Sequence, residues 1–138
     1  MNRITRIIIV SFILNLVWEM FQAILFAPHF FGTADFVLVH IMAACADIII
    51  TLLVLTPELF LSEHMFRTGG RLKWTILSAS LGLLVAVCIE WYAVSSGMWT
   101  YGPYMPIIPF LGVGLTPILQ MMIIPPVAGY VSVRGAHL

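Results

Sequence analysis

The chain contains 138 residues, of which 62% are hydrophobic and 9% are charged. Soluble domains carry about 25% charged residues, so this composition excludes a soluble enzyme and a disordered tail. Six acidic and six basic residues cancel, which argues against nucleic-acid binding through net charge. The length fits one domain with about four membrane crossings of roughly 20 residues each.

Four apolar stretches follow one another along the chain, and each is long enough to cross a bilayer as a helix. Lipid favours helices because it offers no water to the polar groups of an open backbone. Strand-like alternation is absent, so a barrel is not expected. The sequence predicts an all-α integral membrane protein, a four-helix transmembrane bundle in a single domain over residues 1–138, with spans over residues 5–26, 36–55, 72–94 and 107–133.

Proline and glycine mark the expected breaks between these spans. Thr56-Pro57 is expected to end the second span, because the residue before a proline is disfavoured in a helix. Cys45 and Cys88 both fall within spans and do not form a C-x-x-C motif. We expect both cysteines to be small residues of the core.

The basic residues indicate the orientation of the chain. All six fall on one side of the predicted topology, whereas the loops over residues 27–35 and 95–106 contain none; the six are Arg3, Arg6, Arg67, Arg71, Lys73 and Arg134. The positive-inside rule therefore predicts that both termini are cytoplasmic. The expected location is the inner (cytoplasmic) membrane of a bacterium.

Three acidic residues lie inside three different spans: Glu19, Asp47 and Glu90. A charged group at membrane depth costs roughly 2.5–3.5 kcal/mol, and a leucine returns only about 0.3–0.6 kcal/mol. No basic residue lies in a span centre, so His40 is the expected partner for these acids. A functional role explains this cost better than a purely structural one.

Helical spacing places the polar residues of each span on one face. Small residues accompany Glu90 on the third span, which favours close helix packing. We expect all four faces to turn inward; they carry Asn15, Trp18, Glu19 and Gln22, then His40, Asp47 and Thr51, then Glu90, then Thr116, Pro117 and Gln120.

This topology predicts a polar pocket in the outer half of the bundle. The loop over residues 97–106 is rich in aromatic residues and is expected to cover the pocket. Close carboxyls would share at least one proton at neutral pH. A shared proton suits general-acid chemistry, and it suits a proton-coupled carrier equally well.

Residue types then suggest roles. The catalytic candidates are the acids Glu19 and Glu90, with Asp47 and His40 tuning or reloading them. The substrate-binding candidates are Asn15, Trp18, Gln22, Trp99, Tyr101 and Gln120. In the structural alternative, the amides are interhelical hydrogen bonds worth about 0.6 kcal/mol each, and the aromatics form an interface belt. Neither a Glu-x-x-His nor a His-x-x-x-His pair occurs, so no metal and no cofactor are expected.

The third span and its following loop resemble the lycopene-cyclase-type membrane domain of carotenoid biosynthesis. The resemblance rests on Glu90-Trp91 followed by the segment Gly97-Met98-Trp99-Thr100-Tyr101. It implies an acid at Glu90 and a substrate contact at Trp99, in a cyclase that protonates an isoprenoid double bond without a redox change. Where that family has a proline followed by paired glutamates, this chain has residues 114–120 instead.

Three functions follow from these patterns. The favoured one is a membrane protein that binds, and transforms by general-acid chemistry, an isoprenoid or other lipophilic substrate, as a cyclase or isomerase would. The second is a small proton-coupled transporter that acts as a homo-oligomer. The third is a structural subunit of a larger membrane complex. The expected partners are thus a lipophilic molecule and membrane lipids, and no nucleic acid.

Overall fold

The computed structural model describes residues 1–28, 31–60 and 70–134. Within these residues, four helices are long and apolar enough to cross a membrane, as the composition predicts. They are α1 (Arg3–Gln22), which runs on into the short 3-10 helix η1 (Ala23–Leu25), α2 (Thr33–Phe60), α4 (Arg71–Ser95) and α5 (Leu115–Arg134). A short antiparallel hairpin, β1 (Ile107–Ile108) and β2 (Val113–Gly114), precedes α5.

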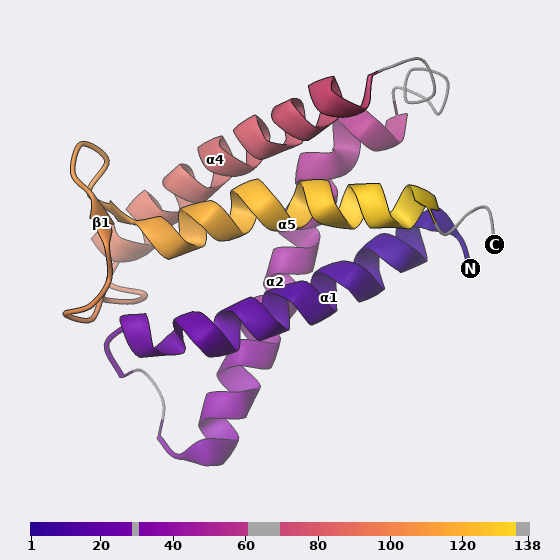
Figure 1. Cartoon of the computed structure of the whole chain (residues 1–138). Coiled ribbons are helices and arrows are strands. Elements are labelled where there is room, and N and C mark those ends of the chain that lie inside the picture. Colours follow the sequence, from indigo (N-terminus) through magenta and orange to yellow (C-terminus); the bar gives the residue numbers. More distant parts are fainter. Residues whose placement is uncertain (29–30, 61–69, 135–138) are drawn as a thin grey trace.

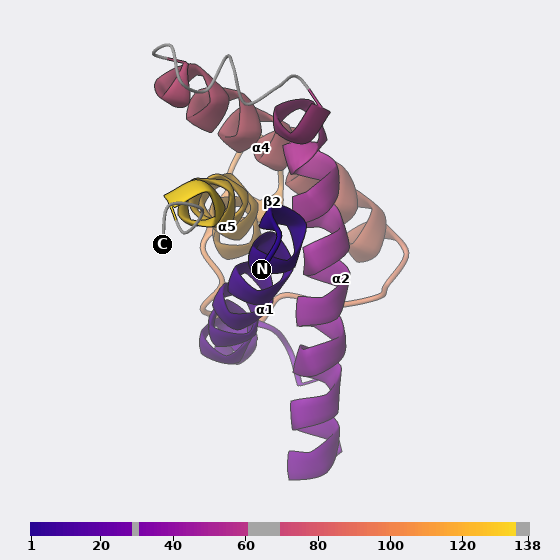
Figure 2. The ribbon, with the colours of Figure 1, turned by 90° about the vertical axis from the view of Figure 1, so that its right-hand side faces the viewer.

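Helix α5 is the centre of the bundle and contacts the three other long helices (Figure 1). Helix α1 packs between α5 and α2, as the end-on view shows (Figure 2). The first residues of α1 lie beside the last residues of α5, as the hydrogen bond from Arg3 Nε to Ser132 Oγ at 3.5 Å shows. We call this the basic end, since α1 and α4 both begin on this side of the bundle (Figure 1), and their first turns carry Arg3, Arg6, Arg71 and Lys73. Arg67 lies outside the described residues.

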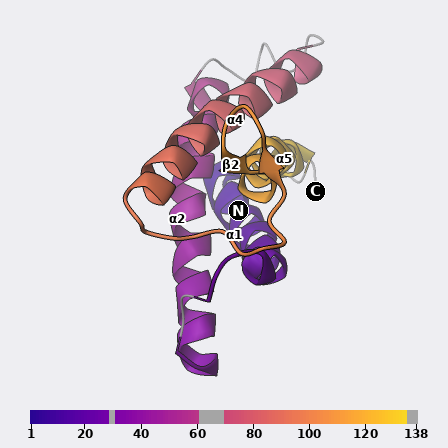
Figure 3. The same ribbon diagram turned by 90° about the vertical axis from the view of Figure 1, so that its left-hand side faces the viewer.

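The opposite end, which we call the hairpin end, is covered by the segment between α4 and α5 (Figure 3). This segment is tied to the end of η1 by two backbone hydrogen bonds, Ala27 N to Thr100 O at 2.9 Å and Gly102 N to Leu25 O at 2.8 Å. A Cβ at Gly102 would lie 3.1 Å from that Leu25 oxygen, so the close approach favours glycine. The loop is therefore fixed against α1 by its backbone.

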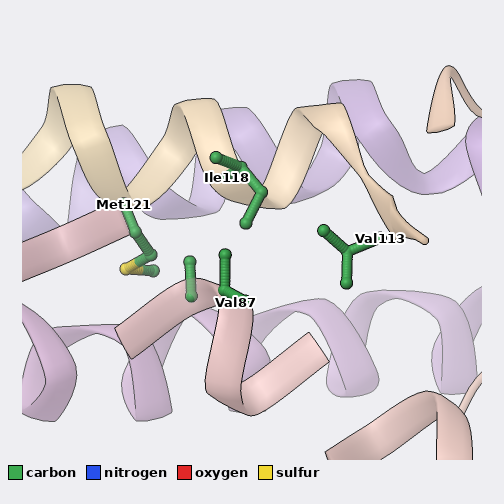
Figure 4. Close-up of a cluster of buried hydrophobic side chains, with 5 residues drawn as sticks. Val87, Val113, Ile118 and Met121 are labelled. Carbon is green, nitrogen blue, oxygen red and sulfur yellow. The ribbon is translucent and has the colours of Figure 1, made fainter. Parts of the chain in front are cut away.

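Helices α4 and α5 pack closely because small residues line α4 where they meet. A Cβ at Gly82 would overlap the carbonyl oxygen of Met121 and lie 2.7 Å from its carbonyl carbon. Beside this contact, an apolar cluster joins α4 to the hairpin and α5 (Figure 4); its buried members are Ala86, Val87, Val113, Ile118 and Met121. This packing places the last turns of α4, and with them Glu90, against α5 and the hairpin.

We expect Gly82→Ala to lower the free energy of unfolding by about 1–3 kcal/mol, because the added methyl overlaps backbone atoms. At an open helical position the same change stabilises by about 0.5–1 kcal/mol, so the predicted sign is diagnostic. Thermal unfolding in detergent, followed by circular dichroism, measures the effect. Ser80→Ala on the exposed side of α4 is the control and should change stability little. A Gly82→Ala protein as stable as the wild type would contradict the close packing.

Three expectations about the elements are wrong. Helix α2 continues through Pro57 to Phe60 instead of ending at Thr56, and the fourth helix begins at Leu115 instead of Ile107. In an apolar solvent, unwinding the helix would leave several backbone groups without hydrogen bonds, whereas a proline inside the helix removes only one hydrogen bond. The continuous α2 therefore costs less free energy than a helix that ends at Thr56. Cys45 and Cys88 are exposed on the outside of the bundle, where lipid would lie, and do not belong to the core.

Candidate functional site

A cavity of about 440 Å³ lies between the four helices, and Phe26, Met98 and Trp99 line it at the hairpin end. Its volume lies in the range of ligand pockets, roughly 300–1,000 Å³. Most of its wall is apolar, and the polar groups come from α1, α2, α4 and α5. We call it the acidic cavity, because Glu19, Asp47 and Glu90 line it together with His40. The rest of the lining consists of Gln22, Gln120, Phe26, Trp99, nine other apolar residues and a proline.

The amide of Gln120 is the centre of the polar wall. Gln120 is 2% exposed, and its Nε2 donates to Asp47 Oδ2 at 2.7 Å, Asn15 Oδ1 at 3.0 Å and Glu19 Oε1 at 3.1 Å. Its Oε1 accepts from Gln22 Nε2 at 3.0 Å, and the same Gln22 nitrogen donates to Glu19 Oε1 at 2.7 Å. One α5 side chain therefore fixes the polar groups of α1 and α2 together.

The carboxyls of Glu19 and Asp47 lie close together, because both accept from the same Gln120 nitrogen. Two carboxylates this close repel each other, which favours one proton shared between them. The two groups then titrate as a pair and not as separate acids. The pair brings a transferable proton to the wall of an apolar cavity.

Glu90 is held in a different way, through the hairpin end. Tyr101 Oη donates to Glu90 Oε2, and Tyr101 Oη itself accepts from the backbone N–H of Gly114 at 2.9 Å. The pKa of Tyr101 is raised, first by burial and then by its hydrogen bond to Glu90. Tyr101 therefore stays a neutral donor at physiological pH, and it orients the Glu90 carboxyl, which is 3% exposed.

His40 completes the wall from α2, where it is 2% exposed. Its Nδ1 lies 2.6 Å from the carbonyl oxygen of Phe36. A carbonyl only accepts, so Nδ1 carries a hydrogen, and in the neutral ring Nε2 is the basic nitrogen. His40 and Glu19 thus face the same cavity from α2 and α1.

The structure brings most of the sequence-predicted site residues together. Two of them do not line the cavity but hydrogen-bond to residues that do: Asn15 accepts from Gln120, and Tyr101 donates to Glu90. Trp18 lies elsewhere, in a second, almost entirely apolar hollow of about 450 Å³ between α1 and α5. Gln22 lines both hollows and is part of the wall between them.

Sequence reasoning missed a second polar cluster, at the basic end. Arg3 and Glu58 form an ion pair in which the Glu58 side chain is 4% exposed. The expected end of the second span at residue 55 left Glu58 in a loop. The signal was present in the spacing, because Glu58 lies seven residues after Thr51 and continues the same helical face.

The residues described by the structure contain no cluster of three or more His, Cys, Asp or Glu side chains suited to a metal ion. The acids of the cavity instead have hydrogen-bond donors on their oxygens, Gln120 for Glu19 and Asp47 and Tyr101 for Glu90. The wall is thus organised by hydrogen bonds between side chains. No protein-family model, curated protein or solved structure matches this chain.

Proposed function

We propose that the acidic cavity binds a lipophilic substrate of the isoprenoid or lipid class and transforms it by general-acid chemistry, as a cyclase or isomerase. The observation that carries this proposal is the Glu19–Asp47 pair, joined by the Gln120 amide, on the wall of a largely apolar cavity. An apolar wall with a few convergent polar groups is typical of small-molecule sites. A proton held there can be delivered to a substrate that water would not dissolve.

In the proposed reaction, the Glu19–Asp47 pair gives its proton to one carbon of a carbon–carbon double bond. The resulting cation is attacked by a second double bond of the substrate, or it loses a proton from a neighbouring carbon. The pair then accepts one proton back, so the product is an isomer of the substrate and no oxidant is needed. Gln120 positions both carboxyls for this exchange.

Glu90 and Trp99 have a complementary role in this proposal. Glu90 receives the Tyr101 hydrogen bond and lines the same cavity, so its carboxyl can stabilise the positive charge that develops on the substrate. The face of the Trp99 ring, also on the cavity wall, attracts a cation through its π electrons. The wall thus offers a proton donor at one place and stabilisation for a cation at another.

We also propose that the basic end faces the cytoplasm of a bacterial inner membrane. The support is the gathering of basic residues at that end and their absence from the hairpin end. The acidic cavity then lies in the outer half of the bundle. A lipophilic substrate would reach it from the bilayer.

The test is product formation by Glu19→Gln and Glu90→Gln proteins. The gently purified wild-type protein is extracted with organic solvent, and bound molecules are identified by mass spectrometry. The protein is then incubated with the bound isoprenoid or lipid, and isomeric products are separated by chromatography. We expect each variant to lose about 10²-fold or more of the activity while keeping its helix content.

Asp35→Asn is the matched control, since Asp35 receives the Phe31 backbone N–H at 2.7 Å in the first turn of α2, outside the acidic cavity. It should keep wild-type activity. Unchanged product formation by both the Glu19→Gln and the Glu90→Gln protein would contradict the proposal.

A further inference from the structure

The interface of α1, α2 and α5 stays polar beneath the acidic cavity, toward the basic end. Ser11, Asn15 and Thr51 are each 0% exposed there. Ser11 Oγ, Asn15 Nδ2 and Thr51 Oγ1 have no hydrogen-bond partner within the described parts of the chain. Native proteins hold few such atoms, because each has given up its hydrogen bonds to water without replacing them. These three groups therefore keep unused hydrogen-bonding capacity inside the bundle.

The register of α1 and α2 places two of these groups at one level. The two helices are antiparallel, with Glu19 and Asp47 at the cavity and the Ile7–Leu55 contact toward the basic end. Ser11 lies four residues after Ile7, and Thr51 lies four residues before Leu55. With a rise of about 1.5 Å per residue, both hydroxyl groups lie roughly 6 Å from the Ile7–Leu55 level.

An apolar layer then interrupts the polar interface. Ile7, Leu55 and Ala128 are each 0% exposed and form one buried cluster. On its far side lie the Arg3–Glu58 ion pair and Ser132, whose backbone oxygen accepts from Arg6 Nη1 at 3.4 Å. From Thr51 to Glu58 the helix rises only about 10 Å, so one layer of three side chains separates the two polar regions.

We propose that this line of polar groups is a proton path through the bundle and that the Ile7–Leu55–Ala128 layer holds it closed. Carboxyls, hydroxyls and water pass protons along hydrogen bonds, and buried acids mark such relays in membrane proteins. A narrow apolar layer excludes water and so interrupts the relay. The path begins at the Glu19–Asp47 pair, continues by Thr51 and Ser11, and meets Glu58 beyond the layer.

The charged and titratable groups around the path are few. Asp47 faces Glu19 from α1 and Gln120 from α5, and Glu58 faces Arg3 from α1. One proton enters the path at one end for each proton that leaves at the other. Net proton flow also needs the movement of another ion, which compensates the charge carried across the membrane. The path does not depend on a substrate, so its test is independent of the enzymatic proposal.

The experiment measures proton entry into sealed vesicles that contain the purified protein and a pH-sensitive dye, with a potassium gradient and valinomycin to set the voltage. We expect wild-type vesicles to acidify at the rate of protein-free vesicles. Leu55→Ser and Ala128→Ser, which hydrate the layer, should acidify several-fold faster. Leu53→Ser lies on the exposed face of the same helix (64% exposed) and should behave as the wild type.

A second variant traces the route. Adding Asp47→Asn to Leu55→Ser should return the rate to the wild-type level, because the amide cannot relay a proton. Gel filtration and helix content establish that each protein is folded. The proposal is overturned if the wild type already conducts, if folded Leu55→Ser and Ala128→Ser conduct no faster than Leu53→Ser, or if the leak survives Asp47→Asn.

Discussion

Replacing Arg3 by methionine is expected to lower the free energy of unfolding by about 3–5 kcal/mol, the usual cost of leaving one member of a buried ion pair without its partner. Arg3 Nη2 contacts Glu58 Oε1, and the Glu58 side chain is 4% exposed whereas that of Arg3 is 23% exposed. Gly129 also packs on this carboxyl, since a Cβ there would lie 3.1 Å from Glu58 Oε2. Water therefore cannot readily replace the guanidinium.

A double-mutant cycle separates the ion pair from general damage at the basic end. Arg3→Met combined with Glu58→Met should be much more stable than Arg3→Met alone, because apolar replacement of both partners leaves no buried charge. Reversible unfolding in detergent gives the four free energies. Arg71→Met, at an exposed basic residue that begins α4, is the control and should change stability by no more than about 0.5 kcal/mol. Equal effects of Arg3→Met and Arg71→Met would show that the pair contributes nothing.

The sequence predicts the long helices well because composition alone decides them. A stretch of about 20 apolar residues has to satisfy its own backbone in lipid, and only a helix does so within one segment. The same reasoning failed for residues 107–114, which are equally apolar but form a hairpin. Pro106, Pro109 and Gly112 (φ +67°) were the local signals for that turn, and an average over apolar residues conceals them.

Helical spacing found the faces of the site but did not assign the contacts. It placed Glu19, Asp47 and Gln120 on inward faces, and the structure makes them direct partners. The helical face with Trp18, Glu19 and Gln22 spans a wide arc around α1, so the spacing did not predict that Trp18 lies only in the other hollow whereas Gln22 lines both. It also could not predict that Tyr101, in a loop, orients Glu90, because that contact depends on how the loop folds back.

Gln120→Leu is expected to destabilise the bundle strongly, because it leaves several buried partners without hydrogen bonds. The amide nitrogen serves Asn15, Glu19 and Asp47, and its oxygen serves Gln22. An unsatisfied buried polar group costs about 1–3 kcal/mol, so the loss of several bonds costs more than a single deletion. Leucine has a similar size, which separates this effect from that of a cavity. Chemical or thermal unfolding in detergent measures it.

Gln120→Asn tests whether the reach of the amide matters as well as its chemistry. Asparagine offers the same donors and acceptor on a side chain shorter by one methylene, so it cannot reach all the partners that glutamine reaches at 2.7–3.1 Å. We expect a stability between the wild type and Gln120→Leu. Ile123→Ala, at a residue that is 44% exposed on the same helix, is the control and should have a small effect. If Gln120→Leu is as stable as Ile123→Ala, then the amide does not organise the wall, and the arrangement of Glu19 and Asp47 must depend on packing alone.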